Sequence, residues 1–225
     1  GEGGYYKSVN EAILAYENGY ITLQSSIHVR RQGTDPQGNP LTETVTSTLG
    51  RFLFNEILPQ DLGYVDRSIP GNELKLEVDF LVAKKQLKQI LEKVNTHGAT
   101  KTAEVLDDIK SMGYKYSTRA AMTVSISDMT VPPQKPELIA RAQDTVDRIT
   151  RNYKRGLITD EERYKEVVET WKETDDELTH ALLSGLDKYN NIFMMADSGA
   201  RGSDKQIKQL AGMRGLMADT TGHTI

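Results

Sequence analysis

The segment from Phe193 to Ser203, which reads FMMADSGARGS, offers the clearest chemistry in the sequence. Gly199 and Gly202 permit backbone conformations and close approaches that a β-carbon would prevent. Arg201 lies between them and supplies a planar, permanently charged donor that suits phosphate. Ser203 then has the residue type of a helix N-cap. The pattern indicates a loop, followed at once by a helix, that could contact a triphosphate.

A second cation follows this loop. Lys208 lies seven residues after Arg201, which is nearly two helical turns, so the two cations could face one site. With Gln206 at the capping-box position, the helix start would add free amides and the positive end of its dipole. The segment is not a P-loop, because it lacks the GKS or GKT ending. The alternative interpretation is a tight turn in which Arg201 pairs with Asp197.

The composition excludes several classes of protein. The chain has 225 residues, 37% hydrophobic and 27% charged, which favours one large or two modest globular domains. It has no cysteine, so disulfides, thiolate metal sites and thiol nucleophiles are excluded. A net charge of −4 argues against nucleic-acid binding through bulk positive charge. The four histidines lack metal-ligand spacing: His28, His97, His180 and His223.

The chain contains no membrane signal. No stretch approaches the roughly 20 apolar residues that a span requires, and Gly1–Gly4 is neither cationic nor apolar as a secretion signal would be. We therefore expect a cytoplasmic protein with no membrane contact.

The first half has a mixed pattern of helices and strands. Ser8 and Glu11 predict a capping box, and Thr48 predicts the cap of a short helix that ends before Pro59. The remaining predicted elements are strands at 21–29 and 42–48, helices at 82–95 and 100–112, and a strand at 122–127. A proline cluster at 132–136 marks the candidate domain boundary.

The second half is predicted to begin with a long antiparallel helical hairpin. Apolar residues recur at alternating steps of three and four, as in a coiled-coil seam: Ile139, Ala142, Val146, Ile149 and Tyr153, then Tyr164, Val168, Trp171, Leu178 and Leu182. The tip is placed at 156–160, where Gly156 interrupts the period and Thr159 with Glu162 forms a capping box. Polar Asp175 stands where the repeat calls for an apolar residue.

The long run at 193–203, continued by QIKQLAGMRGLM at 206–217, resembles the largest catalytic subunit, beta-prime, of bacterial RNA polymerase. Upstream matches agree in order: NEA at 10–12, AYE at 15–17, TLGR at 48–51, FNEILP at 54–59, STRA at 117–120 and DM at 128–129. The resemblance implies an α+β fold in three parts. These are a small mixed α/β pore domain at 1–132, the funnel hairpin or rim helices at 133–190, and a loop and helix next to the nucleotide-addition site at 191–225.

The resemblance also implies roles for particular residues. Arg201 would contact the incoming nucleoside triphosphate, with Met195 packing nearby and Lys208 standing where the family commonly has arginine. Ser127 departs from the pattern, since relatives often carry a second acid there. No residue of this chain is expected to be catalytic, to bind a metal or to hold a cofactor. Magnesium would be bound through residues outside this chain, so we expect the isolated chain to be inactive.

The implied partners are the beta, alpha, omega and sigma subunits, together with DNA and RNA in the whole enzyme. Transcript-cleavage and stringent-response factors would dock on the rim helices. Arg155, Arg163 and Lys165 near the hairpin tip are candidate contacts for acidic factor surfaces, and a merely solvated charged face is the alternative.

Two other classes of function compete with the polymerase. A free-standing adaptor would use the hairpin to bind a partner protein, but this leaves the loop around Arg201 unexplained. An independent nucleotide-binding enzyme would need acid, base or metal residues near Arg201. Only Asp197 and Asp204 are close in sequence, and they form no recognisable catalytic constellation.

Overall fold

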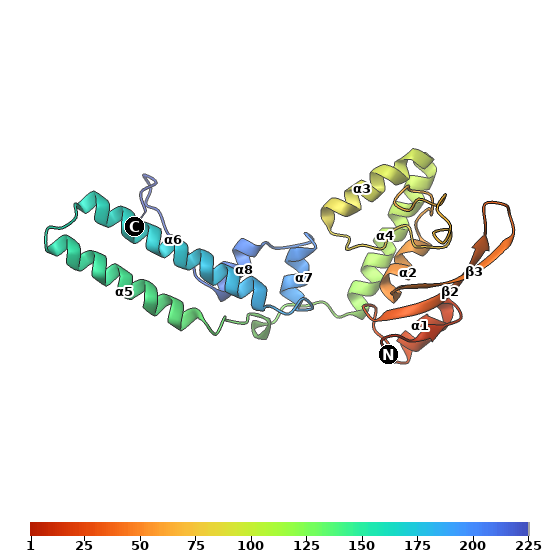
Figure 1. Cartoon of the computed structure of the whole chain (residues 1–225), viewed down its shortest axis with the longest axis horizontal. Helices are drawn as coiled ribbons and strands as arrows, with labels where there is room; N and C mark the ends of the chain where they lie inside the picture. The colour runs from red at the N-terminus through yellow and green to blue at the C-terminus, as the bar shows by residue number, and fades with distance from the viewer. Residues whose placement is uncertain (225) are drawn as a thin grey trace. The chain divides into compact units, whose positions relative to one another are not determined.

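The computed structural model describes residues 1–224 and divides the chain into two compact units, Gly1–Ala121 and Met122–Ile225. The first unit combines a small mixed sheet with helices, and the second is helical (Figure 1). The fold is therefore α+β, as the sequence predicted. Each unit is described by itself below, and the three-part division into pore, hairpin and loop remains a prediction.

The sheet of the first unit has three strands in the order β1-β2-β3. Strand β1 (Tyr5–Tyr6) is parallel to β2 (Ser26–Thr34), which pairs antiparallel with β3 (Pro40–Thr48). The expected strand start at residue 21 is wrong, because a turn precedes Ser26. In this turn the Ser25 hydroxyl accepts a hydrogen bond from the amide of Thr22, 3.0 Å away.

Two capped helices cover the sheet and complete the first hydrophobic cluster. Helix α1 (Val9–Glu17) begins where the Ser8 hydroxyl accepts from the amide of Glu11, but the Glu11 carboxylate accepts from the amide of Lys7, so the predicted capping box is incomplete. Helix α2 (Leu49–Glu56) has Thr48 as its cap, as predicted. The cluster consists of Ala12, Ile21, Ile27, Val29, Leu49, Phe52, Leu53 and Leu76.

A long segment without helix or strand connects residues 57 and 83, and buried polar groups stabilise it. The Arg67 guanidinium donates to the carbonyls of Gln60, Asn72, Glu73 and Lys75. It also pairs with Glu77, whose side chain is fully buried, at 2.9 Å. Backbone groups that have no ladder partner are thereby satisfied, as buried polar groups require.

Helices α3 (Lys84–Val94) and α4 (Ala99–Arg119), joined by the short helix η1 (Asn95–His97), carry the second cluster. This cluster contains Leu58, Leu62, Val78, Ile90, Val94 and Val105. The predicted end of α4 at Gly113 is wrong. The helix continues because Met112 and Tyr116 pack on the first cluster, and this contact outweighs the modest cost of one glycine inside a helix.

The strand predicted at 122–127 is also absent. Residues 122–125 have no regular structure, and a single turn of 3₁₀ helix, η2 (Ile126–Asp128), follows. The alternation of apolar residues was misleading because no strand pairs with this segment, and Ile126 is 92% exposed. Ser125 caps the turn instead, and its amide donates to the Asp128 carboxylate at 2.8 Å.

The second unit contains the predicted antiparallel hairpin. Helices α5 (Lys135–Lys154) and α6 (Asp160–Gly185) lie side by side along their length (Figure 1). Gly156, with φ of +71°, begins the turn, and Thr159 and Glu162 form the predicted capping box. Ala142, Ile149, Leu178 and Leu182 are the buried apolar residues of the seam. Helices α7 (Asn191–Asp197) and α8 (Asp204–Ala211) follow.

In the part of the chain that is described, every helix is too short or too polar to cross a lipid bilayer.

Candidate functional site

The loop predicted to contact phosphate consists of residues 198–203, between α7 and α8. It is shorter than the sequence indicated, because Met195 belongs to the last turn of α7. Gly199 and Gly202 have φ of +76° and +84°, a region that favours glycine. The amide of Arg201 donates to the Met195 carbonyl at 3.1 Å. The backbone of the loop is therefore tied to the end of α7.

The Arg201 side chain is exposed, and among residues 1–224 it forms no ion pair. The alternative in which Arg201 pairs with Asp197 is not what the structure contains. An exposed guanidinium on an anchored backbone retains its full donor capacity for an external anion.

The start of α7 is anchored to the η2 turn through one side chain. Asn190 caps the helix by accepting from the amides of Ile192 and Phe193. Its side-chain amide also donates to the Asp128 carbonyl at 2.9 Å. Residues 62 positions apart are thereby joined, and Ser127, the position that departs from the family pattern, lies in the same turn.

Helix α8 is attached to the hairpin by apolar and polar contacts. Ile207 and Ala211 pack with Leu182 of α6 in a small buried cluster. Next to this cluster the Lys208 ammonium donates to Asp175 Oδ2 at 2.6 Å. The polar residue that interrupts the seam is therefore the partner of the second predicted phosphate-binding cation.

The segment after α8 folds back onto the start of α6. The Tyr164 hydroxyl donates to the Thr224 carbonyl and accepts from the Thr224 amide, both at 3.1 Å, and the Tyr164 ring stacks on His223 with centroids 4.6 Å apart. A turn centred on Asp219 precedes this contact. Hydrogen bonds from the Thr221 hydroxyl and from backbone amides lower the pKa of Asp219.

The hairpin tip carries the three predicted docking cations. Arg155 is exposed at the end of α5, and Lys165 is exposed on the first turns of α6. Arg163 is partly buried, because it pairs with Asp160 at 2.7 Å and lies over the Tyr153 ring. The three cations therefore differ in freedom, and Arg163 is the most constrained.

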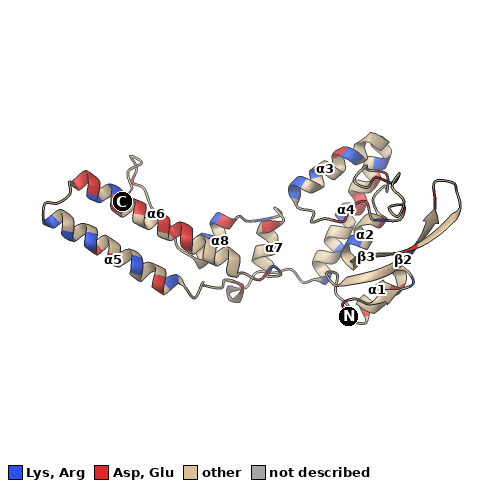
Figure 2. Ribbon diagram, in the orientation of Figure 1, with Lys and Arg blue, Asp and Glu red and all other residues tan. Residues whose placement is uncertain are grey.

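Helix α6 is strongly acidic along most of its length. It carries nine acidic and three basic residues, and Figure 2 shows the acidic ones in red along the helix. The acidic residues of its first turn, Asp160 to Glu162, stabilise the helix because they lie at the positive end of its dipole. The cations predicted to dock a factor therefore border an acidic surface.

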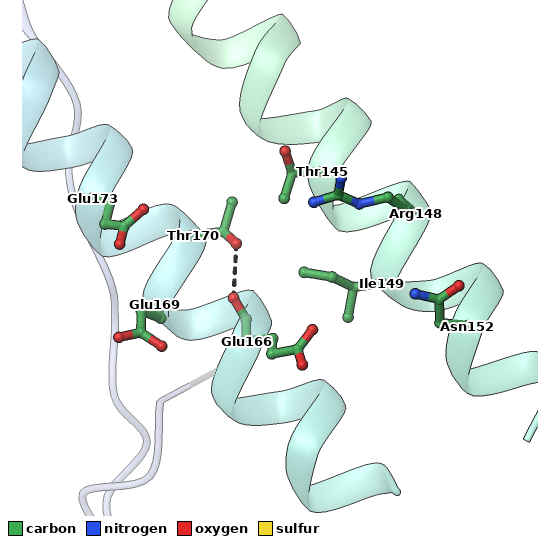
Figure 3. A pocket seen from close by; sticks show the side chains of 8 residues that line it. All are labelled: Thr145, Arg148, Ile149, Asn152, Glu166, Glu169, Thr170 and Glu173. Carbon is green, nitrogen blue, oxygen red and sulfur yellow. Dashed lines mark hydrogen bonds between the residues drawn. The ribbon is translucent and has the colours of Figure 1, made fainter. Parts of the chain in front are cut away.

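A groove of about 490 Å³ lies between α5 and α6 near this end of the hairpin. Glu166, Glu169 and Glu173 line one side, and Arg148 and Asn152 line the other (Figure 3). Three carboxylates around one opening repel phosphate. The groove is therefore unsuited to a triphosphate, which leaves the loop at Arg201 as the better candidate.

Within residues 1–224, no three metal-ligating side chains gather in a cluster that could hold a metal ion.

The sequence pattern did not identify the residues that hold the site in place. The sequence marks Asp175 only as an interruption of the seam, and it gives no indication of the partners of Asn190 and Tyr164. The one available signal was the polar residue at a seam position, because such residues commonly have a specific partner. Contacts over 33 to 62 residues leave no periodic trace in the sequence.

The first unit is mixed α/β, and the second contains a helical hairpin and a glycine-flanked arginine loop. Residues 3–129 match the family described as RNA polymerase Rpb1, domain 3, and residues 158–224 match RNA polymerase Rpb1, domain 4. The chain belongs to the family of DNA-directed RNA polymerase subunit beta'.

Similar proteins include the DNA-directed RNA polymerase subunits beta' of three bacteria. The chain is 71% identical to that of Lachnoclostridium phytofermentans, and 52% identical to those of Acetivibrio thermocellus and Clostridium acetobutylicum. In each case the whole chain is covered, but it spans only 18 to 19% of the relative's length.

Proposed function

We propose that the chain acts as part of the beta' subunit of a bacterial DNA-directed RNA polymerase, a cytoplasmic nucleotidyltransferase. In this role it lines the secondary channel through which nucleotides enter. Its partners are then the beta, alpha, omega and sigma subunits, with DNA and RNA held by the assembly. Two observations support the assignment to this subunit: the family membership, and the 71% sequence identity to the beta' subunit of Lachnoclostridium phytofermentans over the full length of the chain.

The proposed substrate contact is the loop at residues 198–203. The observation that carries it is the exposed Arg201 guanidinium on a backbone anchored to Met195. It stands directly before α8, whose free amides and positive dipole end favour an anion. Met195 packs beside the nucleotide, and Lys208 adds a second charge. An ammonium has three donors, so the bond to Asp175 does not exhaust Lys208.

Arg201→Ala tests this contact in a polymerase assembled from the full-length subunit. Loss of one charged phosphate contact is expected to raise KM for nucleoside triphosphates about tenfold. Arg201→Lys keeps the charge without the planar fork and should recover only part of the affinity. Arg148→Ala is the matched control, because it removes an exposed arginine next to the acidic groove. An unchanged KM in Arg201→Ala would overturn the contact.

The hairpin tip is the proposed docking site for transcript-cleavage and stringent-response factors. Arg155 and Lys165 are free to meet an acidic factor surface, while Arg163 would contribute after exchanging its bond to Asp160. Rim charges mainly change the association rate and its salt dependence. Arg155→Ala with Lys165→Ala should therefore slow binding of a cleavage factor most strongly at low salt.

Lys172→Ala is the control for the tip, since it removes an exposed lysine from the same helix away from the turn. Equal association rates for the tip variant, the control and the unaltered enzyme would show that the tip cations are only a solvated face.

A further inference from the structure

Asp175 is a buried carboxylate at a position where the hairpin repeat calls for an apolar side chain. The residue is 8% exposed, and its Oδ2 accepts from Lys208 at 2.6 Å. Its Oδ1 is buried and has no hydrogen-bond partner among residues 1–224. Leaving a buried carboxylate oxygen without a partner is costly, so stability of the hairpin alone does not account for this residue.

The apolar contact between α8 and α6 does not by itself fix the rotation of α8. Ile207 and Ala211 provide the buried surface that meets Leu182, and apolar attraction is non-directional. A charge-assisted hydrogen bond depends on both distance and direction. The bond between Lys208 and Asp175 therefore selects one rotation and one register of α8.

The chain beyond α8 approaches the same carboxylate. Gly215 has φ of +82°, and a β-carbon at this position would lie 3.4 Å from Asp175 Oδ2. At the preceding turn, the Lys135 ammonium donates to the Gly212 carbonyl at 2.9 Å. Asp175 thus lies beneath both α8 and the segment that leaves it.

We propose that Asp175 is a positioning residue: through Lys208 it sets the register of α8 on α6 and so places Arg201, which lies three residues before the start of α8. This inference rests on the proposed contact between Arg201 and the nucleotide. A buried polar group that selects one packing arrangement at some cost in stability is a known use of such residues in helical seams.

The key variant is Asp175→Leu, studied in a polymerase assembled from the full-length subunit. Leucine is the type of residue that the seam calls for, so the hairpin is retained while Lys208 loses its partner. Asp175→Glu keeps a carboxylate for Lys208. The matched control is Glu177→Gln, which removes the exposed ion pair between Glu177 and Arg141 two residues away. The measurements are KM and kcat for nucleoside triphosphates and amide exchange in α6 and α8.

Asp175→Leu is expected to raise KM about fivefold, with a smaller change in kcat, because displaced contact groups weaken binding. Amides of α8 should exchange faster while those of α6 keep their protection. Asp175→Glu should recover most of the affinity, and Glu177→Gln should match the unaltered enzyme.

Two results would overturn the proposal. An unchanged KM with unchanged exchange in α8 would mean that Asp175 does not position the helix. A lower KM would mean that the carboxylate only restrains the charge of Lys208, which then binds triphosphate more freely. If Arg201→Ala also leaves KM unchanged, the nucleotide contact itself is wrong, and exchange in α8 alone decides whether Asp175 sets the register.

Discussion

The two units of the chain maintain their structure by different means. The first unit, Gly1–Ala121 (unit 1), has clusters of eight and six buried hydrophobic residues, which pack between a sheet and helices α1 to α4. The second unit, Met122–Ile225 (unit 2), has a cluster of three buried hydrophobic residues among those described and the seam between α5 and α6. Polar contacts attach the start of α7, helix α8 and Thr224 to the rest of this unit. In unit 1 the loss of one polar contact lowers the free energy of unfolding, but the broad core keeps the surrounding elements in place. In a thin hairpin the same loss changes where the attached loop lies.

The largest expected effect is in the core of unit 1. Phe52→Ala removes a side chain that is 1% exposed at the centre of the first cluster. The free energy of unfolding of unit 1 should fall by about 3–5 kcal/mol, from lost burial and the cavity left behind. Amide exchange by mass spectrometry should show faster exchange in β2 and α2 but not in α6. Equal acceleration in α6 would show that the two units unfold together.

The next effect concerns the irregular segment of unit 1. Glu77→Gln leaves Arg67 without its charged partner in a buried network and should cost about 3 kcal/mol in the free energy of unfolding. Denaturant unfolding followed by the fluorescence of tyrosines in this unit would measure it.

Glu92→Gln is the control for this network, because it removes only an exposed pair with Lys88 and should cost less than about 0.5 kcal/mol. A similar small loss in both variants would mean that the irregular segment depends on its apolar contacts instead.

A smaller effect is expected where the chain after α8 meets the hairpin. Tyr164→Phe removes the hydroxyl that bonds to both backbone groups of Thr224 but keeps the ring stacked on His223. Opening of residues 218–224 should become easier by about 1 kcal/mol, seen as faster amide exchange confined to this segment. Tyr153→Phe is the control at the tip. Faster exchange throughout α6 would mean that this contact supports the hairpin as well.

The smallest effect is a dependence of the Asp219 turn on pH. The pKa of Asp219 is lower in the folded turn than in the unfolded chain, mainly because the Thr221 hydroxyl donates to the carboxylate. The ionised form therefore stabilises the turn fully above the ordinary aspartate pKa of about 4, and this contribution is lost as pH falls through the lowered pKa. Amide shifts of Thr221 and His223 should follow this loss, and Asp219→Asn should abolish it.

Much of the secondary structure, and the family, can be predicted from the sequence alone. Local chemistry and a regular period predict the helix caps at Thr48 and Thr159, the hairpin tip at Gly156 and the seam, and these predictions are confirmed. Local signals gave wrong predictions at two places. Packing on the first cluster extends α4 beyond Gly113, and the strand predicted at 122–127 does not form because no strand pairs with this segment.

The contacts that hold the candidate site together arise only in the folded unit. The sequence placed Arg201 and Lys208 in a loop and helix, but it could not pair Lys208 with Asp175 or tie Asn190 to the Asp128 turn. Such bonds join residues far apart in the chain, and their partners are chosen by how the helices pack. Local pattern sets which elements form, whereas the position of the charged groups depends on contacts that exist only in the folded unit.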